Sequence, residues 1–554
     1  MELLTNLGDG FAVAFSPMNL IYVTLGVLIG TVIGLLPGLG ATAAIAILLP
    51  LTFSLDPATA IIMLAGIYYG SMYGGRVPSI LLRLPGDASS VITTLDGYPL
   101  ARQGKAGVAL GITAIGSFIG GTIAIIGLTF LAPLLAQYAA RVGAPELFAL
   151  TLFGIIMIGF VGSGSRLKSM SLAGLGLLVA AIGTDPMAGT PRLTFGSVDL
   201  SAGIDIVPVA VGLFGLGEIF YTMEKRSATT GHAQPIRRIL PNRAEWLLTR
   251  WAILRASVLG FFVGILPGGG GAISSVLAYG VEKRISKRPE KFGKGALEGL
   301  AATETADNAS SNSAFIPLLT LGVPPNAVMA LLFGALLMQN VTPGPQLINT
   351  HPEVFFGVIA SMYIGNALLL LLNLPLIRVF VLILKIPTSI LSPIIVIVAF
   401  LGVYAVNSSM FDVVVCIVFG IIGYLLKKLQ FDMAPFILAF VLGPIMEVEF
   451  RRTMTLSDGS LTIFFERPVA LAILLTVSLF VVLSLAASIR RPGRGMPPAL
   501  AVPSPVDAES PAQDAGGPEG SGTAAESSAP SPEQDASTDE HASPHQDPTQ
   551  RSDG

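Results

Sequence analysis

The stretch Gly264-Ile-Leu-Pro-Gly-Gly-Gly-Gly271 resembles an earlier stretch of the same chain, Gly34-Leu-Leu-Pro-Gly-Leu-Gly40. Each stretch ends one apolar run and begins another. Proline lacks the backbone N–H and glycine loses the most conformational freedom in a helix, so both stretches predict helix breaks. In a lipid-embedded helix, a break is tolerated only where protein or a water-filled cavity satisfies the freed backbone groups. Breaks at matching positions of two halves point to the binding site of a transporter.

The composition indicates a membrane protein. Of the 554 residues, 52% are hydrophobic and 12% are charged, whereas soluble domains carry about 25% charged residues. Apolar runs near the required length of roughly 20 residues recur, among them residues 19–36, 106–135 and 354–371. None of these runs alternates strictly, which favours helices over a β-barrel. The sequence predicts an all-α polytopic membrane protein with about ten to twelve transmembrane helices.

Further matches between the two halves indicate an internal repeat. Pro78 and Pro85 correspond to Pro317 and Pro324, and the spacing of seven is kept. The offset between the halves grows from 230 residues at the breaks to 239 at these prolines. The second half contains an additional polar stretch, residues 282–294, which explains the growth.

The distribution of basic residues predicts the orientation of the two halves. Residues 224–250 and 282–294 are both rich in Lys and Arg, so the positive-inside rule places both in the cytoplasm. The segment between them must then enter the membrane and return. The flanks of the first break carry only acidic charges, at Glu2, Asp9 and Asp56, which fits entry from the outside. The halves are therefore predicted to be inverted repeats with broken or re-entrant helices.

The predicted organisation has five parts. Residues 491–554 form an acidic segment rich in Pro and Ser that cannot bury enough apolar surface to fold, so we expect a disordered, cytoplasmic tail. The parts are a first membrane repeat (1–225), a basic cytoplasmic linker (226–249), a second membrane repeat (250–450), a final transmembrane helix region (451–490) and the tail (491–554).

A polar stretch of the second half is the main candidate for chemistry. Its carboxylate, amide and hydroxyl oxygens are hard ligands that suit Na⁺, and its amide and hydroxyl donors suit a bound carboxylate. The alternative is that the Ser and Asn side chains cap helices and satisfy broken backbone. The candidates for cation coupling are Glu304, Asp307 and Asn308, and those for substrate binding are Asn308, Ser310, Ser311, Asn312 and Ser313.

The first half supplies the counterpart of this stretch. Arg76 lies among apolar residues, and an arginine inside a membrane is usually paired or functional. A bidentate contact with a substrate carboxylate is one interpretation. The other is that Arg76 lies at an interface or pairs with Asp87. The remaining candidates for substrate binding are Pro37, Gly38, Gly40, Tyr73, Gly74, Gly75, Pro267, Gly268 and Gly270.

Three other acidic residues receive structural interpretations. Glu218 stands alone in an apolar run, and we place it near the cytoplasmic edge beside Lys225 and Arg226. Asp185 and Asp432 lie at the ends of apolar runs, where we expect them to cap helices.

Enzyme chemistry is not indicated by the sequence. The four histidines form no metal motif, and neither a phosphate-binding loop nor a Gly-x-Ser-x-Gly elbow occurs. An intramembrane enzyme would need a nucleophile–base pair or a metal set, neither of which is evident. We predict no enzyme activity, no cofactor, and no metal beyond a transported Na⁺.

Several motifs together resemble the large membrane subunit of the tripartite tricarboxylate transporters, the TctA family, over roughly residues 15–485. They are the two Leu-Pro-Gly-x-Gly stretches, Leu95-Asp-Gly-Tyr-Pro99 and Ile316-Pro-Leu-Leu-Thr-Leu-Gly322. The resemblance implies a secondary transporter subunit in the bacterial cytoplasmic (inner) membrane that imports small carboxylates, such as citrate, with Na⁺ or H⁺. It also implies a small four-helix membrane subunit and a periplasmic solute-binding protein as partners. The alternative is a channel or a permease for another small anionic solute.

Overall fold

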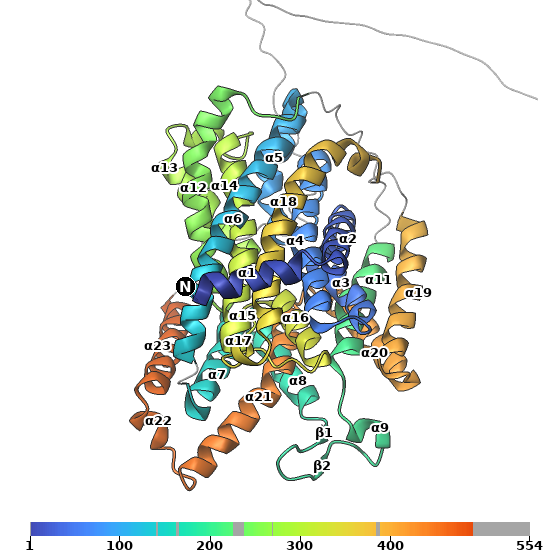
Figure 1. The fold of residues 1–554 in the computed structure, drawn as a ribbon, viewed down its shortest axis with the longest axis vertical. Helices are drawn as coiled ribbons and strands as arrows, with labels where there is room; N and C mark the ends of the chain where they lie inside the picture. The colour runs from blue at the N-terminus through green and yellow to red at the C-terminus, as the bar shows by residue number, and fades with distance from the viewer. Residues whose placement is uncertain are drawn as a thin grey trace, which may run out of the picture. The chain divides into compact units, whose positions relative to one another are not determined.

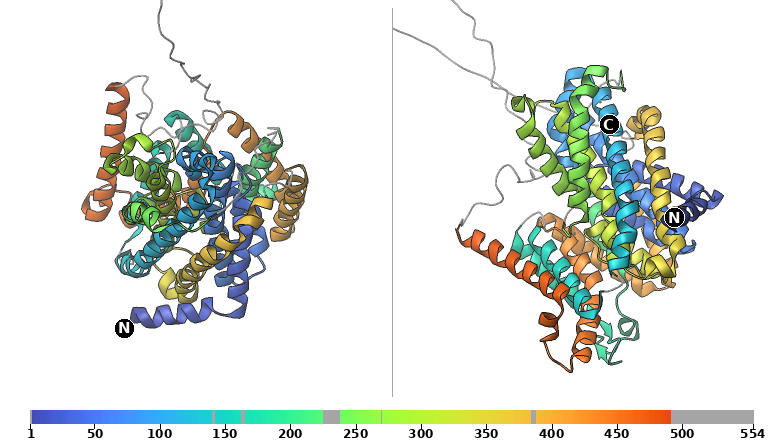
Figure 2. Two further views of the ribbon diagram at one scale, coloured as in Figure 1. Left: turned by 90° about the horizontal axis from the view of Figure 1, so that it is seen from above. Right: turned by 60° about the vertical axis from the view of Figure 1, so that its left-hand side comes forward.

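The described part of the chain is built of α-helices and contains one short β-ribbon. The structure, a computed structural model, describes residues 2–139, 142–161, 165–224, 238–268, 270–383 and 388–490. Residues 226–237 of the predicted linker and the whole of the predicted tail, residues 491–554, lie outside these ranges. Figures 1 and 2 show the helices of the described part packed side by side.

The first half of the chain begins with a helix along residues 2–14 and then forms two pairs of helices around the first break. Its main helices are α1 (Glu2–Ala14), α2 (Pro17–Gly34), α3 (Gly40–Leu48), α4 (Pro57–Leu82), α5 (Thr93–Leu100) and α6 (Ala106–Ala139). They are followed by α7 (Ala144–Val161), α8 (Arg166–Ala180), β1 (Gly183–Thr184), β2 (Pro191–Arg192), α9 (Val198–Ser201), α10 (Ile206–Ala210) and α11 (Gly217–Glu224).

The second half also places helices on both sides of its break. Its helices are α12 (Arg243–Ile265), α13 (Gly271–Ile285), α14 (Leu297–Ser313), α15 (Phe315–Leu321), α16 (Ala327–Met338), α17 (Leu347–Thr350) and α18 (Pro352–Ile383). The chain continues with α19 (Thr388–Asn407), α20 (Met410–Lys428), α21 (Ala434–Leu456), α22 (Ile463–Glu466) and α23 (Pro468–Arg490). Helix α12 begins inside the predicted linker, because Asn242 and Glu245 form a capping box there.

The prediction of an all-α polytopic membrane protein is confirmed. In the described ranges, six helices are long and apolar enough to cross a membrane, and five shorter apolar helices accompany them. These six long helices are fewer than the ten to twelve transmembrane helices predicted from apolar runs of about 20 residues each. The breaks explain part of the difference, because they divide apolar runs into helices too short to qualify alone, such as the one over Gly40–Thr52.

The helices next to the two breaks pack through glycines at equivalent positions. Gly30 and Gly34 of α2 lie against the backbone of Ile67 and Ser71 in α4. In the second half, Gly260 and Gly264 of α12 lie against Ala306 and Ser310 of α14. The glycines of the second half follow those of the first by 230 residues, and the residues they contact follow by 239. These are the two offsets found between the halves in the sequence. The internal repeat thus extends to the packing of α2 on α4 and of α12 on α14.

The helix ends that follow are also equivalent. Helix α4 ends at Arg83 with a left-handed backbone (φ 61°), and the Leu84 N–H donates to the Pro78 carbonyl. Helix α15 ends at Gly322 (φ 68°), and the Val323 N–H donates to the Pro317 carbonyl. At both ends a left-handed residue lets the next N–H reach back to a proline carbonyl six residues earlier, which satisfies a carbonyl that a helix terminus leaves free.

The longest helices of the two halves, α6 and α18, run in opposite directions. In Figure 1, α6 descends from α5 to α7, whereas α18 rises from α17. Helix α6 also packs against both α12 and α14, as Figure 2 shows, so the halves share one contact surface.

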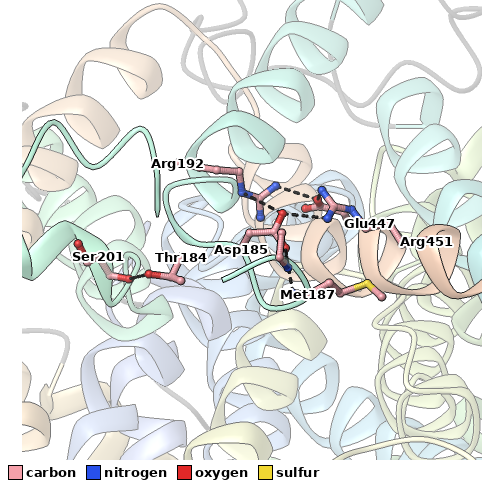
Figure 3. Close-up of polar contacts among 8 residues, drawn as sticks. Thr184, Asp185, Met187, Arg192, Ser201, Glu447 and Arg451 are labelled. Atoms are coloured by element: carbon pink, nitrogen blue, oxygen red, sulfur yellow. Dashed lines mark hydrogen bonds and ion pairs between the residues drawn. The ribbon is translucent and has the colours of Figure 1, made fainter. Parts of the chain in front are cut away.

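The prediction that Asp185 caps a helix is wrong. Asp185 follows β1, and its Oδ1 accepts the N–H groups of Met187 and Ala188 at 2.8 and 2.9 Å, which closes the turn to β2. Its Oδ2 pairs with Arg451 of α21 at 2.9 Å, and Glu447 joins Arg451 to Arg192 (Figure 3). These partners come from α21, so the local sequence carries no signal for them. Asp432, by contrast, accepts the N–H of Ala434 at the start of α21, as a capping residue does.

A glycine-to-valine exchange tests the close approach of α12 and α14. We expect Gly260→Val to destabilise the protein by about 1–3 kcal/mol, because its side chain has no room beside the Ala306 backbone. Gly280→Val in α13 is the matched control, since no atom lies within 4 Å of its added Cβ. Thermal unfolding of both purified variants in detergent measures the difference, and equal melting temperatures would contradict the packing described.

The pH dependence of unfolding tests the Asp185 turn. The backbone N–H groups of Ala188 and Met187, together with Arg451, hold the pKa of the Asp185 carboxyl below its ordinary value. Its ionised form therefore stabilises the folded state above the ordinary value of about 3.9, and that contribution is lost as the pH falls through the lowered pKa. Asp185→Asn should unfold at a lower temperature than wild type at pH 7, and the gap should narrow below pH ~4. A gap independent of pH would refute this account.

Candidate functional site

Both helix breaks lie against one short segment, residues 86–89, which connects α4 to α5. At the first break, a Cβ added to Gly40 would lie 3.2 Å from the Cβ of Asp87. At the second break, a Cβ added to Gly271 would lie 2.9 Å from the Cβ of Ser89 and against the Asp307 carboxylate. The structure thus brings the two predicted breaks to one place, although they are 230 residues apart in the sequence.

Two carboxylates meet at Ser89 in this segment. The Ser89 Oγ is 2.8 Å from Oδ1 of Asp87 and 3.0 Å from Oδ2 of Asp307. Asp307 is 3% exposed, and its Oδ1 has no hydrogen-bond partner. Asp87 also accepts the N–H of Ser90 at 2.9 Å. A buried carboxylate oxygen without a donor is costly, so this cluster lacks a counter-charge or a donor.

Arg76 is buried beside this cluster in the middle of α4. It is 1% exposed, and its guanidinium carbon lies 3.8 Å from the centroid of the Tyr73 ring. The nearest hydrogen-bond acceptor is the Ser117 hydroxyl at 3.5 Å, and Nε of Arg76 has no partner. No ion pair joins Arg76 to any carboxylate of the described residues, Asp87 included. The alternative that Arg76 pairs with Asp87 is therefore wrong in this structure.

One face of α14 turns its polar side chains toward α5 and α6. The Glu304 Oε1 accepts a hydrogen bond from the Thr93 hydroxyl, and Oε2 has no partner. Asn308 donates from Nδ2 to the Ser117 hydroxyl at 2.8 Å and to the Glu304 carbonyl at 3.1 Å. Asn312 donates to the Asn308 carbonyl at 2.8 Å. The spacing of four residues therefore gathers these side chains on one face of α14.

The serines of α14 make contacts of a different kind. Ser310 and Ser311 both donate to the Asp307 carbonyl at 2.9 Å, and Ser313 donates to the Ser310 carbonyl at 3.2 Å. Ser274 of α13 donates to the Ser310 hydroxyl at 2.9 Å. These bonds satisfy the backbone and join α13 to α14, which is the structural alternative given for these serines above.

Several predicted site residues of the breaks, all within the described ranges, show no contact with the carboxylates of the cluster. The Gly268 N–H donates to the Pro325 carbonyl at 2.9 Å, and no atom lies within 4 Å of a Cβ added to Gly270. Pro37 lines a cavity of about 30 Å³ between the first break, α11 and α19. A Cβ added to Gly38 would lie 3.1 Å from Oε1 of Glu218. By contrast, Gly74 and Gly75 lie at the cluster, against Gly34 and Gly86.

Glu218 has a partner that the sequence does not suggest. It is buried, lies behind the first break, and pairs with Lys427 of α20. Lys225 and Arg226, its expected neighbours, lie outside the described residues. The pairing of α11 with α20 depends on tertiary structure, so an estimate from nearby sequence charges misses it.

The structure adds residues that the sequence analysis does not select. Ser89, Thr93, Ser117 and Ser274 all bond candidate residues of α14. Single hydroxyl residues in apolar runs usually bond their own helix backbone, so the sequence does not distinguish them. Asp87 is an acidic residue directly after Pro85-Gly86, and this position was the sequence signal that could have identified it as a candidate site residue.

Asp96 fixes the start of α14 from the first half of the chain. Its Oδ1 accepts the N–H groups of Gly293, Gly295 and Ala296, each at 2.8 Å. Asp96 belongs to the Leu95-Asp-Gly-Tyr-Pro99 motif, so the motif has a structural role here. It ties α5 to the loop from which α14, with Glu304 and Asp307, begins.

Three charged members of the cluster are closed to solvent in this structure, whereas Asp87 is partly exposed. Arg76, Glu304 and Asp307 are each at most 3% exposed. A wider cavity of about 460 Å³ lies elsewhere, among residues 142–147, Met187 and residues 449–456, and no predicted site residue lines it. A solute can reach Arg76, Glu304 and Asp307 only after the surrounding helices move.

Comparison with known proteins decides the family. The sequence model of the tripartite tricarboxylate transporter TctA family matches residues 20–438. The chain belongs to this family. The matched range contains both breaks and every residue of the cluster.

Two proteins of Agrobacterium vitis are similar to this TctA family member. The uncharacterized 52.8 kDa protein in the TAR-I ttuC' 3' region of Agrobacterium vitis is 45% identical over 490 residues, which cover 88% of this chain and 98% of that protein. An uncharacterized protein in the TAR-II ttuC' 3' region of the same organism is 49% identical over 231 residues, 42% of this chain and 96% of that protein. No solved structure matches the chain.

Removal of the Asp96 carboxylate tests how the start of α14 is held. Asp96→Ala leaves three N–H groups without their acceptor, and the buried Ala296 N–H alone should cost roughly 1–3 kcal/mol. We expect a lower unfolding temperature than wild type. Asp56→Ala is the control, because Asp56 precedes α4 without making a side-chain capping bond. If both variants unfold like wild type, Asp96 does not anchor α14.

Proposed function

We propose that this TctA family member is the large membrane subunit of a cation-coupled importer of small carboxylates, including tri- and dicarboxylates such as citrate. In this proposal it resides in the bacterial cytoplasmic membrane. It works with a small four-helix membrane subunit and receives substrate from a periplasmic solute-binding protein. The membership in the TctA family supports a tricarboxylate transporter subunit, and the site supplies the arguments for the rest.

The unpaired guanidinium of Arg76 is the observation that supports an anionic substrate. An arginine at membrane depth costs about 2.5–3.5 kcal/mol even on insertion scales, so it is normally paired. Here Nε has no partner, and the ring of Tyr73 and the hydroxyl of Ser117 are weak compensation. A carboxylate bound to the guanidinium would form charge-assisted, bidentate hydrogen bonds. The Asn308 amide next to Ser117 would provide a further polar contact.

The same geometry supports alternating access as the mechanism. The cluster lies between helices of both halves, since Thr93 bonds Glu304 and Ser89 bonds Asp307. The longest helices of the two halves, α6 and α18, run in opposite directions, as inverted repeats would place them (Figure 1). A movement of one half against the other would open the cluster first to one side and then to the other.

The basic residues support the orientation of the chain. The side chain of Gln103 donates to the Lys294 carbonyl, so the basic stretches at residues 102–105 and 283–294 lie at the same end. By the positive-inside rule this end is cytoplasmic. The turn at Asp185 then faces the periplasm, the side from which the binding protein delivers substrate.

Carboxylate uptake into proteoliposomes tests this function. The vesicles hold the chain, its small subunit and its binding protein, and labelled citrate, succinate and lactate are offered with and without Na⁺ and proton gradients. We expect gradient-dependent accumulation of at least one acid. Arg76→Gln should lower that accumulation at least about tenfold, because one lost charge-assisted contact of this kind is worth 1.5–3 kcal/mol or more.

Arg83→Gln is the matched control, because Arg83 lies seven residues away on an exposed helix end. Arg and Gln are both unbranched at Cβ, so the substitution leaves the cost of the left-handed backbone at this position about the same. Uptake by Arg83→Gln should equal that of wild type. Full uptake by Arg76→Gln would remove Arg76 from the substrate site. Flux of any acid at rates beyond alternating access, without the binding protein, would indicate a channel instead.

A further inference from the structure

The hydroxyl of Ser89 cannot satisfy both carboxylates that contact it. A serine hydroxyl has one proton, so it donates either to Asp87 at 2.8 Å or to Asp307 at 3.0 Å. The other contact then brings two oxygens together without a hydrogen between them. Two anionic groups at this distance from one oxygen require an additional positive charge.

The other carboxylate oxygen of Asp307 also lacks a hydrogen-bond donor. Its Oδ1 is buried and has no hydrogen-bond partner. A single proton on Asp307 satisfies only one of these two oxygens. On Oδ2 it would supply the missing hydrogen toward Ser89, and Oδ1 would remain without a donor. A metal cation differs from a proton here, because it binds several oxygens at once.

The geometry points to a Na⁺ site formed by the carboxylates of Asp87 and Asp307 and the hydroxyl of Ser89. All three groups are hard oxygen ligands of the kind that alkali and alkaline-earth cations prefer over soft metals. No Lys or Arg of the described residues forms an ion pair with either carboxylate, so no protein cation already fills the role. Two of the three residues, Asp87 and Ser89, lie outside the cation candidates that the sequence suggests.

The surrounding backbone fits a small cation. The carbonyl oxygen of Gly34, the last residue of α2, lies against Gly75 and Gly86, next to Asp87. The C-terminal end of a broken helix carries partial negative charge and is where such transporters place a coupling cation. Arg76 lies beside the cluster but forms no ion pair with either carboxylate, and neither Glu304 of α14 nor Tyr68 of α4 adds positive charge.

This site deepens the proposed function, on which it rests for its role in coupling. Ser89 belongs to the first half and Asp307 to the second, so a cation between them would hold the two halves together at the breaks. The bound cation would stabilise the closed arrangement, and its release would accompany opening. Coupling of this kind requires only that the cation bind one arrangement better than the other.

Cation binding is tested first without any carboxylate. Unfolding of the purified chain in detergent is followed in NaCl, KCl and N-methylglucamine chloride at equal ionic strength. NaCl should raise the unfolding temperature of wild type by at least about 2 °C over the other two salts. Asp307→Asn and Ser89→Ala should lose this shift, and Asp56→Asn should keep it. An equal response to all three salts, or a response only to Mg²⁺, Ca²⁺ or pH, would overturn the Na⁺ site.

Transport then separates coupling from substrate binding. In proteoliposomes, Arg83→Gln, which leaves the cluster intact, should retain both the exchange of a labelled for an unlabelled carboxylate and the accumulation that a Na⁺ gradient drives. Asp307→Asn, in protein that elutes as folded, should lose the accumulation that a Na⁺ gradient drives. Accumulation by Asp307→Asn like that of wild type would overturn the site. If wild type binds Na⁺ but moves no carboxylate, the proposed function fails and the site stands.

Discussion

The need to satisfy backbone and buried polar groups without water governs this structure. A helix that breaks at membrane depth frees N–H and carbonyl groups that lipid cannot bond. In this chain two such breaks are brought against one segment, residues 86–89, and against the polar face of α14. The carboxylates, amides and hydroxyls gathered there make the breaks tolerable. They also make the junction the place where a polar solute and a cation can be bound within an apolar protein.

The glycines next to the breaks make this gathering geometrically feasible. Because Gly30 and Gly34 lie on the backbone of α4, and Gly260 and Gly264 on that of α14, each pair of helices approaches more closely than side chains would allow. Hydrogen bonds then cross between the halves, from Ser89 to Asp307 and from Thr93 to Glu304. A motion of either half must therefore rearrange the cluster. In this way the packing of the repeat connects the fold to the transport mechanism that we propose.

Much of the architecture is readable from the sequence because it rests on local chemistry. Pro-Gly breaks, a duplicated spacing of prolines and a polar face with a period of four are properties of short stretches, and each has its counterpart in the structure. The partners of single side chains are different. Asp185 meets Arg451, Glu218 meets Lys427, and Ser117 meets Asn308 through contacts between distant helices. The closeness of these helices depends on the whole packing, so no local pattern encodes it.

Accessibility of the connecting segment tests the central claim, that the junction of the two breaks opens and closes during transport. Cys416 is the only cysteine of the chain, so Cys416→Ala gives a background for a single new cysteine, Ala88→Cys, between Asp87 and Ser89. Its labelling by a membrane-impermeant thiol reagent is measured in vesicles from either side, with and without carboxylate and Na⁺. The account predicts that the two ligands together change the labelling rate several-fold and shift the side from which the reagent reacts. Labelling that is unaffected by both ligands would contradict it.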